Sequence, residues 1–154
     1  MLPFRNRKYV YNYRSCTRST WTNVSPWLEF FAGPVIGFVL RLEGETGSLY
    51  ISGDTVYFNA LEEIAKRFQV KATILHNGAV RFPYLSGNGL YTMDAEQLLN
   101  AIRLFKARQN LIIHHSGWTH FTEKNLHKTL ETESTAKIMN PGDSAYIEWD
   151  ESNY

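Results

Sequence analysis

Apolar residues recur in this chain with two different periods, and the alternation of the two limits the folds that it can adopt. Short apolar runs typical of strands occupy residues 35–42, 48–52, 70–75, 110–114, 137–139 and 145–149. Apolar residues at helical spacing occupy residues 58–68, about 92–108 and 122–133. Strands and helices that alternate in this way predict an α/β fold, with a mixed sheet packed by about three helices.

Local signals predict where several of these elements begin and end. Asn59 followed by Glu62 has the spacing of a capping box at the start of the first helix. Asp94 is placed favourably at the positive end of the second helix. Residues 140–143, Asn-Pro-Gly-Asp, predict a β turn between the last two strands. Residues 76–89 are expected to form a long loop, and long loops are often functional.

Size and cysteine content indicate a single domain in a reducing compartment. The chain has 154 residues, of which 44% are hydrophobic, so it can bury one core. Its single cysteine, Cys16, cannot form an internal disulfide and has no partner for a C-x-x-C pair. No apolar run is long enough for a signal peptide or a membrane span. We therefore expect a soluble cytoplasmic protein with no membrane partner.

The first residues are basic and rich in tyrosine. Five basic residues precede the first acid, Glu29, although the net charge of the whole chain is only +1. Such a segment can contact nucleic acid through phosphates and stacking, but a solvated edge strand or a chain terminus is the commoner outcome. Nucleic acid is therefore not an expected partner.

Two candidate sites lie where predicted strands end. Asp54 follows one strand, and the pair His114 and His115 ends another. The carboxyl ends of parallel strands converge on one crevice, where a carboxylate and an imidazole can together bind a divalent metal ion such as zinc. Two ligands make a weak site, however. Asp54 as a loop residue bonded to backbone amides, and His114 as a satisfied histidine, remain open alternatives.

Three ordered blocks carry a family resemblance. Residues 47–58 (Gly-Ser-Leu-Tyr-Ile-Ser-Gly-Asp-Thr-Val-Tyr-Phe), 74–83 (Ile-Leu-His-Asn-Gly-Ala-Val-Arg-Phe-Pro) and 114–121 (His-His-Ser-Gly-Trp-Thr-His-Phe) resemble a branch of the metallo-β-lactamase-fold hydrolases. The resemblance implies an αββα sandwich of two similar halves, with up to two metal ions between them. Residues 33–150 would be the C-terminal half of this domain, after an irregular basic and aromatic segment, 1–32, and before a short tail, 151–154.

The same resemblance implies roles for individual residues. Asp54 matches the aspartate that bridges both metal ions, and His114 matches the last metal-binding histidine. The resemblance gives no ligand role to His115. Four further residues of the motif blocks are expected to line the pocket or to orient the ligands, with a purely structural role as the alternative: His76, Arg81, Trp118 and His120.

Most metal ligands of the family are missing from this sequence. The family's His-x-His-x-Asp-His cluster is absent, because no two of the five histidines are separated by a single residue. The stretch at 27–34, where the family has another metal-binding histidine, contains none. Two ligands can hardly hold a metal ion in the open geometry that hydrolysis requires.

The sequence therefore predicts a truncated or degenerate metal-dependent hydrolase, with weak zinc binding and little or no activity alone. One alternative is a non-catalytic assembly protein whose exposed sheet is buried against a second copy or another partner, such as the missing N-terminal half. Another is a competent hydrolase that recruits ligands from a partner chain or from His120 and His127.

Overall fold

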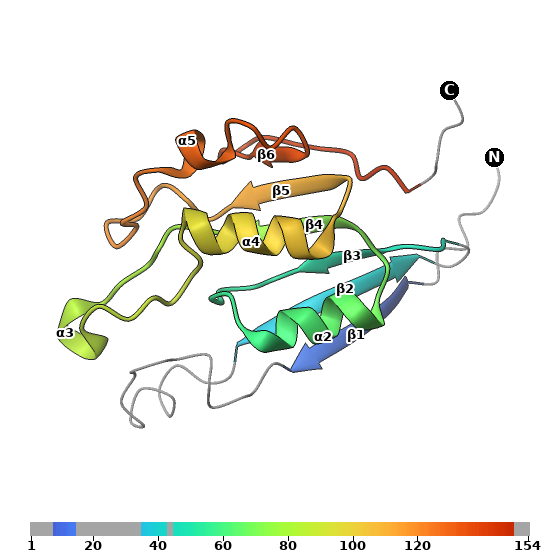
Figure 1. The fold of residues 1–154 in the computed structure, drawn as a ribbon, viewed down its shortest axis with the longest axis horizontal. Coiled ribbons are helices and arrows are strands. Elements are labelled where there is room, and N and C mark those ends of the chain that lie inside the picture. Colours follow the sequence, from blue (N-terminus) through green and yellow to red (C-terminus); the bar gives the residue numbers. More distant parts are fainter. Residues whose placement is uncertain (1–7, 15–34, 43–44, 150–154) are drawn as a thin grey trace.

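The fold is a single six-stranded sheet with helices on one face (Figure 1). It was obtained as a computed structural model, which describes residues 8–14, 35–42 and 45–149. The strands follow one another across the sheet in sequence order: β1 (Lys8–Arg14), β2 (Ile36–Leu42), β3 (Ser48–Ile51), β4 (Val70–His76), β5 (Gln109–Ile113) and β6 (Ala136–Ile138). Strands β1 to β3 pair antiparallel and β3 to β6 pair parallel, so the prediction of a mixed sheet is confirmed.

The helices are the crossover connections that the parallel strands require. Helix α2 (Asn59–Arg67) joins β3 to β4, α4 (Ala95–Phe105) joins β4 to β5, and α5 (Leu126–Leu130) joins β5 to β6. Both α2 and α4 lie against the same face of the sheet (Figure 1). A short helix, α3 (Pro83–Ser86), lies inside the predicted loop at 76–89. No helix within the described ranges is long and apolar enough to cross a lipid bilayer.

Alternate residues of the strands point toward the helices and form the core. The Tyr50 ring lies 4.8 Å from the Phe105 ring, between β3 and α4. Eight residues at the centre of this core are at most 3% exposed: Val39, Tyr50, Leu61, Ile64, Leu75, Leu98, Ile102 and Ile112. Apolar residues that recur at helical and strand spacing in the sequence therefore form this core.

The opposite face of the sheet is also apolar. The register places Phe38 opposite Ile51 and Ile51 opposite Ile74, and Ile74 is paired in turn with Leu111. These side chains alternate with those of the core and so point away from the helices. Part of this open face is approached by the segment around Met139, but Phe38 remains 37% exposed.

The predicted capping box at the start of α2 is wrong. The residue that caps this helix is Phe58, in an extended conformation and with no side-chain cap bond, and Asn59 is already the first helical residue. The Phe58 ring is buried in the core, and its carbonyl accepts from the Leu61 amide at 3.0 Å. Burial of the aromatic ring, rather than a polar cap, therefore sets where α2 begins.

Helix α5 is shorter than the predicted range of 122–133. The residues before it bond to other elements: the Thr122 hydroxyl donates to the Ala79 carbonyl at 2.5 Å, and the Thr122 amide donates to the Gly78 carbonyl at 2.9 Å. The Glu123 carboxylate accepts from the Ala95 amide at 2.6 Å, at the start of α4. These tertiary hydrogen bonds replace a helical turn.

The last predicted strand, residues 145–149, is also wrong, although the turn before it is confirmed by the bond from the Asp143 amide to the Asn140 carbonyl at 3.0 Å. Backbone carbonyls of this segment instead accept from side chains. Gln109 Nε2 donates to the Tyr146 carbonyl at 2.9 Å and Lys71 Nζ donates to the Trp149 carbonyl at 2.6 Å. Side-chain contacts take the place of a strand ladder here.

Strand β1 lies within the segment 1–32 that was predicted to be irregular. It pairs with β2 from Lys8 opposite Leu42 to Arg14 opposite Ile36, so this part of the segment extends the sheet at its edge. Residues 1–7 and 15–34, together with Cys16, lie outside the described residues. The domain boundaries therefore stay a prediction.

Asp94 lies at the positive end of α4, as the sequence predicts, and the structure shows that it caps this helix, which begins at Ala95. Asp94 Oδ1 accepts from the Gln97 amide at 2.9 Å. We expect Asp94→Ala to lower the free energy of unfolding by about 1 kcal/mol, the usual loss when a cap is removed. Urea unfolding would measure this loss, with Glu96→Ala as the control because Glu96 is exposed in the same turn. Equal losses in the two variants would contradict a capping role for Asp94.

Candidate functional site

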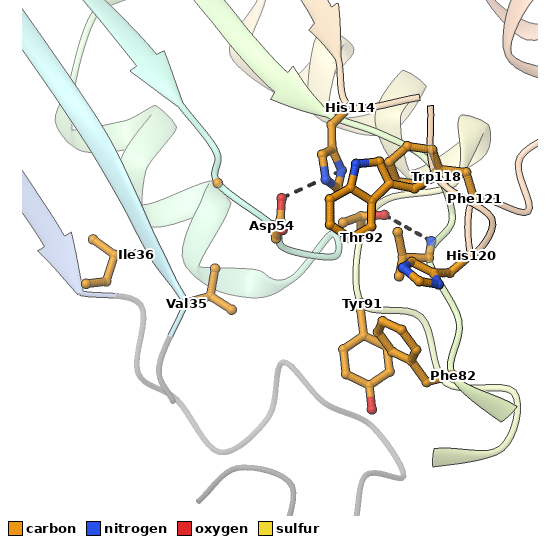
Figure 2. A pocket seen from close by; sticks show the side chains of 12 residues that line it. Val35, Ile36, Asp54, Phe82, Tyr91, Thr92, His114, Trp118, His120 and Phe121 are labelled. Atoms are coloured by element: carbon orange, nitrogen blue, oxygen red, sulfur yellow. Dashed lines mark hydrogen bonds and ion pairs between the residues drawn. The ribbon is translucent and has the colours of Figure 1, made fainter. Parts of the chain in front are cut away.

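The candidate site is built where three parallel strands end side by side. The chain turns sharply after β3, β4 and β5 through residues with left-handed backbone conformations, namely Gly53 (φ 64°), Gly78 (φ 117°) and His114 (φ 61°). Such turns at neighbouring strand ends direct the following side chains into one crevice. Asp54 and His114 are brought together there, with 3.7 Å between Asp54 Oδ1 and His114 Nδ1 (Figure 2).

Gly53 is required for the approach of Asp54 to this crevice. A Cβ atom at position 53 would lie 2.5 Å from the Ile36 carbonyl oxygen, and the positive φ is strained for any other residue. The Ser-Gly-Asp order in the sequence therefore has a steric reason as well as a chemical one.

The orientation of His114 leaves one ring nitrogen available as a ligand. His114 Nδ1 lies 3.3 Å from the Asn77 carbonyl oxygen. A carbonyl oxygen only accepts, so Nδ1 carries the hydrogen and Nε2 keeps its lone pair. Metal-binding histidines are commonly oriented by such a bond. The Asp54 side chain is 60% exposed, so it can change rotamer without breaking any packing.

His76 lies beside this pair, at the end of β4. Its ring centroid is 5.5 Å from that of His114, and its Nδ1 lies 3.2 Å from the Ser52 hydroxyl, which also accepts from the His76 amide at 3.0 Å. Burial lowers the pKa of His76, Asp54 opposes this change, and His114 adds to it. The net direction is downward, so His76 is neutral at pH 7.

This lowered pKa makes stability depend on pH. The unfolded chain binds a proton at His76 more readily than the folded chain does, so the free energy of unfolding falls as the pH is lowered below about 6.5. We expect urea unfolding to show lower stability at pH 5.5 than at pH 7.5, and a smaller difference in His76→Asn. An unchanged difference in the variant would contradict this assignment.

The donor set of the site is too small for a complete metal centre. The 3.7 Å distance joins Asp54 Oδ1 to His114 Nδ1, the nitrogen that carries the hydrogen, so a shared metal ion would require Asp54 to turn toward Nε2. Across the described ranges, no three His, Cys, Asp or Glu side chains are grouped to hold a metal ion. His115 Nε2 lies 3.0 Å from the Met139 carbonyl oxygen, and His127 is exposed on α5.

A cavity of about 680 Å³ opens next to Asp54 and His114. Figure 2 shows Val35 and Ile36 on one side of it and a group of rings on the other. The cavity wall contributed by the loops after β4 and β5 comprises Val80, Phe82, Tyr91, Thr92, Trp118, His120 and Phe121.

Two of the four predicted pocket residues line this cavity. Trp118 and His120 do so, with ring centroids 5.4 Å apart. His76 does not line the cavity itself but contacts His114, which does. Arg81 does not line the cavity, because its guanidinium donates to the Asn88 carbonyl within its own loop. The roles of all four in binding stay predictions.

Several cavity residues are missed by sequence reasoning. Thr92 is buried and its hydroxyl accepts from the Val80 amide at 3.0 Å, while the Phe82 and Tyr91 rings meet edge to face at 4.9 Å. The available signal was the presence of Phe82 in the predicted loop at 76–89 and of Tyr91 just after it. Nothing in local spacing shows that these rings meet those of residues 118–121.

Sequence comparison finds relatives that are metal-dependent hydrolases. No family model matches the chain. A UPF0173 metal-dependent hydrolase of Pelotomaculum thermopropionicum is 26% identical over 121 residues, which cover 76% of this chain and 47% of the relative. Another, from Nanoarchaeum equitans, is 30% identical over 82 residues, which cover 53% of this chain and 32% of the relative. The chain thus spans less than half the length of each relative.

This chain also covers only about half the length of the solved structures that it matches. An isothiocyanate hydrolase from Delia radicum gut bacteria matches with a TM-score of 0.70 and 18% identity, over 92% of this chain and 55% of that one. A possible metal-dependent hydrolase from Veillonella parvula matches with a TM-score of 0.74 and 19% identity over the same shares. These similarities, together with the sheet described above, show that the chain has part of a metallo-β-lactamase-like fold, as the sequence predicts.

Proposed function

We propose that this chain forms part of a metal-dependent hydrolase site, in which Asp54 and His114 bind a divalent ion and zinc is the ion bound. The observation that carries the proposal is that these two side chains meet after β3 and β5 although they are 60 residues apart in the sequence, with 3.7 Å between Asp54 Oδ1 and His114 Nδ1. A bound zinc ion would lower the pKa of a water molecule and polarise a carbonyl or phosphoryl group. The hydrolase relatives support this chemistry.

We further propose that the chain alone binds zinc weakly and hydrolyses little or nothing. A structural zinc site with four ligands provides about 10–16 kcal/mol of binding free energy. Two ligands provide much less, so we expect a Kd weaker than about 10 µM. Full activity would then require further ligands from outside the described residues or from another chain. We also propose a cytoplasmic location, because the single cysteine, Cys16, cannot form an internal disulfide.

Calorimetric zinc titration tests this function directly. We expect Kd in the micromolar range for the unaltered chain and at least about tenfold weaker binding when Asp54→Ala and His114→Ala are combined. The control is Asp143→Ala, which removes a carboxylate from an exposed position that no interpretation of the site uses.

Two results would contradict the proposal. Equal zinc binding by the double variant and the unaltered chain would show that Asp54 and His114 are not ligands. A nanomolar Kd that the double variant loses would instead show a complete site, and substrate screening should then follow.

A second candidate function follows from the open face of the sheet. On the side away from the helices Phe38 is 37% exposed and lies beside the partly exposed Ile51 and Ile74, whereas Leu111 at the end of this row is buried. Exposed apolar side chains that lie together mark sites of association in soluble proteins. We propose as the alternative function a non-catalytic assembly protein, in which this face is buried against a second copy of the chain or against another domain.

A further inference from the structure

The cavity beside Asp54 and His114 has an almost continuous aromatic wall. The Tyr91 and Phe82 rings lie 4.9 Å apart, the Phe82 and His120 rings 5.0 Å, and the His120 and Trp118 rings 5.4 Å. The series joins two loops, one after β4 and one after β5. Rings linked in this way hold each other in fixed orientations, so they offer a preformed surface for a flat group.

One ring of this wall remains largely uncovered. Trp118 is 68% exposed although it lines the cavity, whereas Tyr91 at the other end of the series is only 9% exposed. An exposed indole is a large apolar surface, and its face prefers offset or edge contacts with another aromatic ring. Its place in the cavity puts this face within reach of a molecule that enters the cavity.

Two polar side chains of the cavity, Asp54 and His114, lie together. Figure 2 shows this pair, with Val35 and Ile36 facing the aromatic wall across the hollow. A cavity of about 680 Å³ with this division suits a small molecule that has a flat apolar part and one polar end.

We propose that this cavity binds a small molecule with an aromatic ring, which stacks on Trp118 and directs the polar end of the molecule toward Asp54 and His114. This inference names the substrate class of the site proposed above. The role of the polar end rests on that proposed function. Binding of the ring itself needs no metal ion, so the two ideas can fail separately.

The test uses two alcohols of similar size, benzyl alcohol and cyclohexylmethanol, of which only the first has an aromatic face. Each is titrated into the metal-free, ¹⁵N-labelled full chain while the backbone amides of Val80 and Thr92, which line the cavity, are followed by NMR. We expect saturable shifts with benzyl alcohol, and an affinity about threefold to tenfold weaker for cyclohexylmethanol, the usual contribution of an aromatic pair.

The Trp118→Leu variant should bind benzyl alcohol about threefold to tenfold more weakly than the unaltered chain does. It should bind the two alcohols with equal affinity. Because Trp118 is so exposed, this substitution leaves the core intact. The matched control is Tyr146→Leu, since Tyr146 is 93% exposed and lies outside the cavity, and this variant should bind as the unaltered chain does.

Three results would overturn the inference: no saturable shift at Val80 and Thr92, equal affinity of the unaltered chain for both alcohols, or equal losses in Trp118→Leu and Tyr146→Leu. Ring binding without zinc binding would leave the inference in place and remove the proposed metal function. Zinc binding without ring binding would do the reverse.

Discussion

Gly78→Ala is expected to lower the free energy of unfolding by about 3 kcal/mol, through backbone strain of about 1–2 kcal/mol and overpacking of about 1–3 kcal/mol. Gly78 has φ 117°, and a Cβ atom there would lie 2.7 Å from the His114 carbonyl oxygen and 2.8 Å from Phe121 Cδ1. The His114 carbonyl belongs to backbone and cannot move alone. The substitution must therefore separate the loop after β4 from the loop after β5.

The matched control for this substitution is Gly142→Ala. Gly142 also has a positive φ, 93°, but no atom lies within 4 Å of the position that its Cβ would take. Alanine at 142 thus adds the strain without the clash and should lower stability by about 1–2 kcal/mol. Urea unfolding of the two variants separates the contributions. If both lose the same stability, close packing between the two loops does not support the site.

Loss of stability at Gly78 should be accompanied by disturbance of the site. Both His114, the proposed ligand, and Phe121, which lines the cavity, contact the space that the new methyl group would occupy. NMR spectra of Gly78→Ala should therefore show shifted signals for these two residues, whereas those of Gly142→Ala should not.

Phe38→Glu is expected to abolish self-association if the open face of the sheet is buried against a second copy of the chain. Burial of an unpaired carboxylate costs several kcal/mol, so the dimer should become at least about 100-fold weaker. Phe38 is 37% exposed in the single chain, so the charge can be solvated in the monomer. Sedimentation equilibrium would show the unaltered chain as a dimer of two 17.8 kDa subunits and the variant as a monomer.

The control for this prediction is Tyr84→Glu, in which an aromatic residue on α3 is replaced by the same charge. Tyr84 is fully exposed and is not part of the sheet, so this variant should remain a dimer. A monomeric unaltered chain, or equal masses for the unaltered chain and Phe38→Glu, would argue against a second copy on this face. The open face would then have to be covered by another domain.

Local sequence determined the elements whose ends depend on neighbouring residues. The helical period and the acidic residue Asp94 near its start predict α4, and the Asn-Pro-Gly-Asp pattern predicts the turn at 140–143. Strands β2 to β6 follow from short apolar runs, with ends within about two residues of the predictions. The approach of Asp54 to His114 is also expected from the sequence, because both residues follow strands whose carboxyl ends converge in a parallel arrangement.

Only the tertiary structure decided the features that depend on contacts between distant segments. Burial of the Phe58 ring moved the start of α2, and hydrogen bonds from Thr122 to the loop after β4 shortened α5. Arg81 was turned away from the cavity by a bond within its own loop, while Tyr91 was brought to its wall. The physical reason is the same in each case: packing and hydrogen bonds across the chain outweigh the small free energies of local propensity.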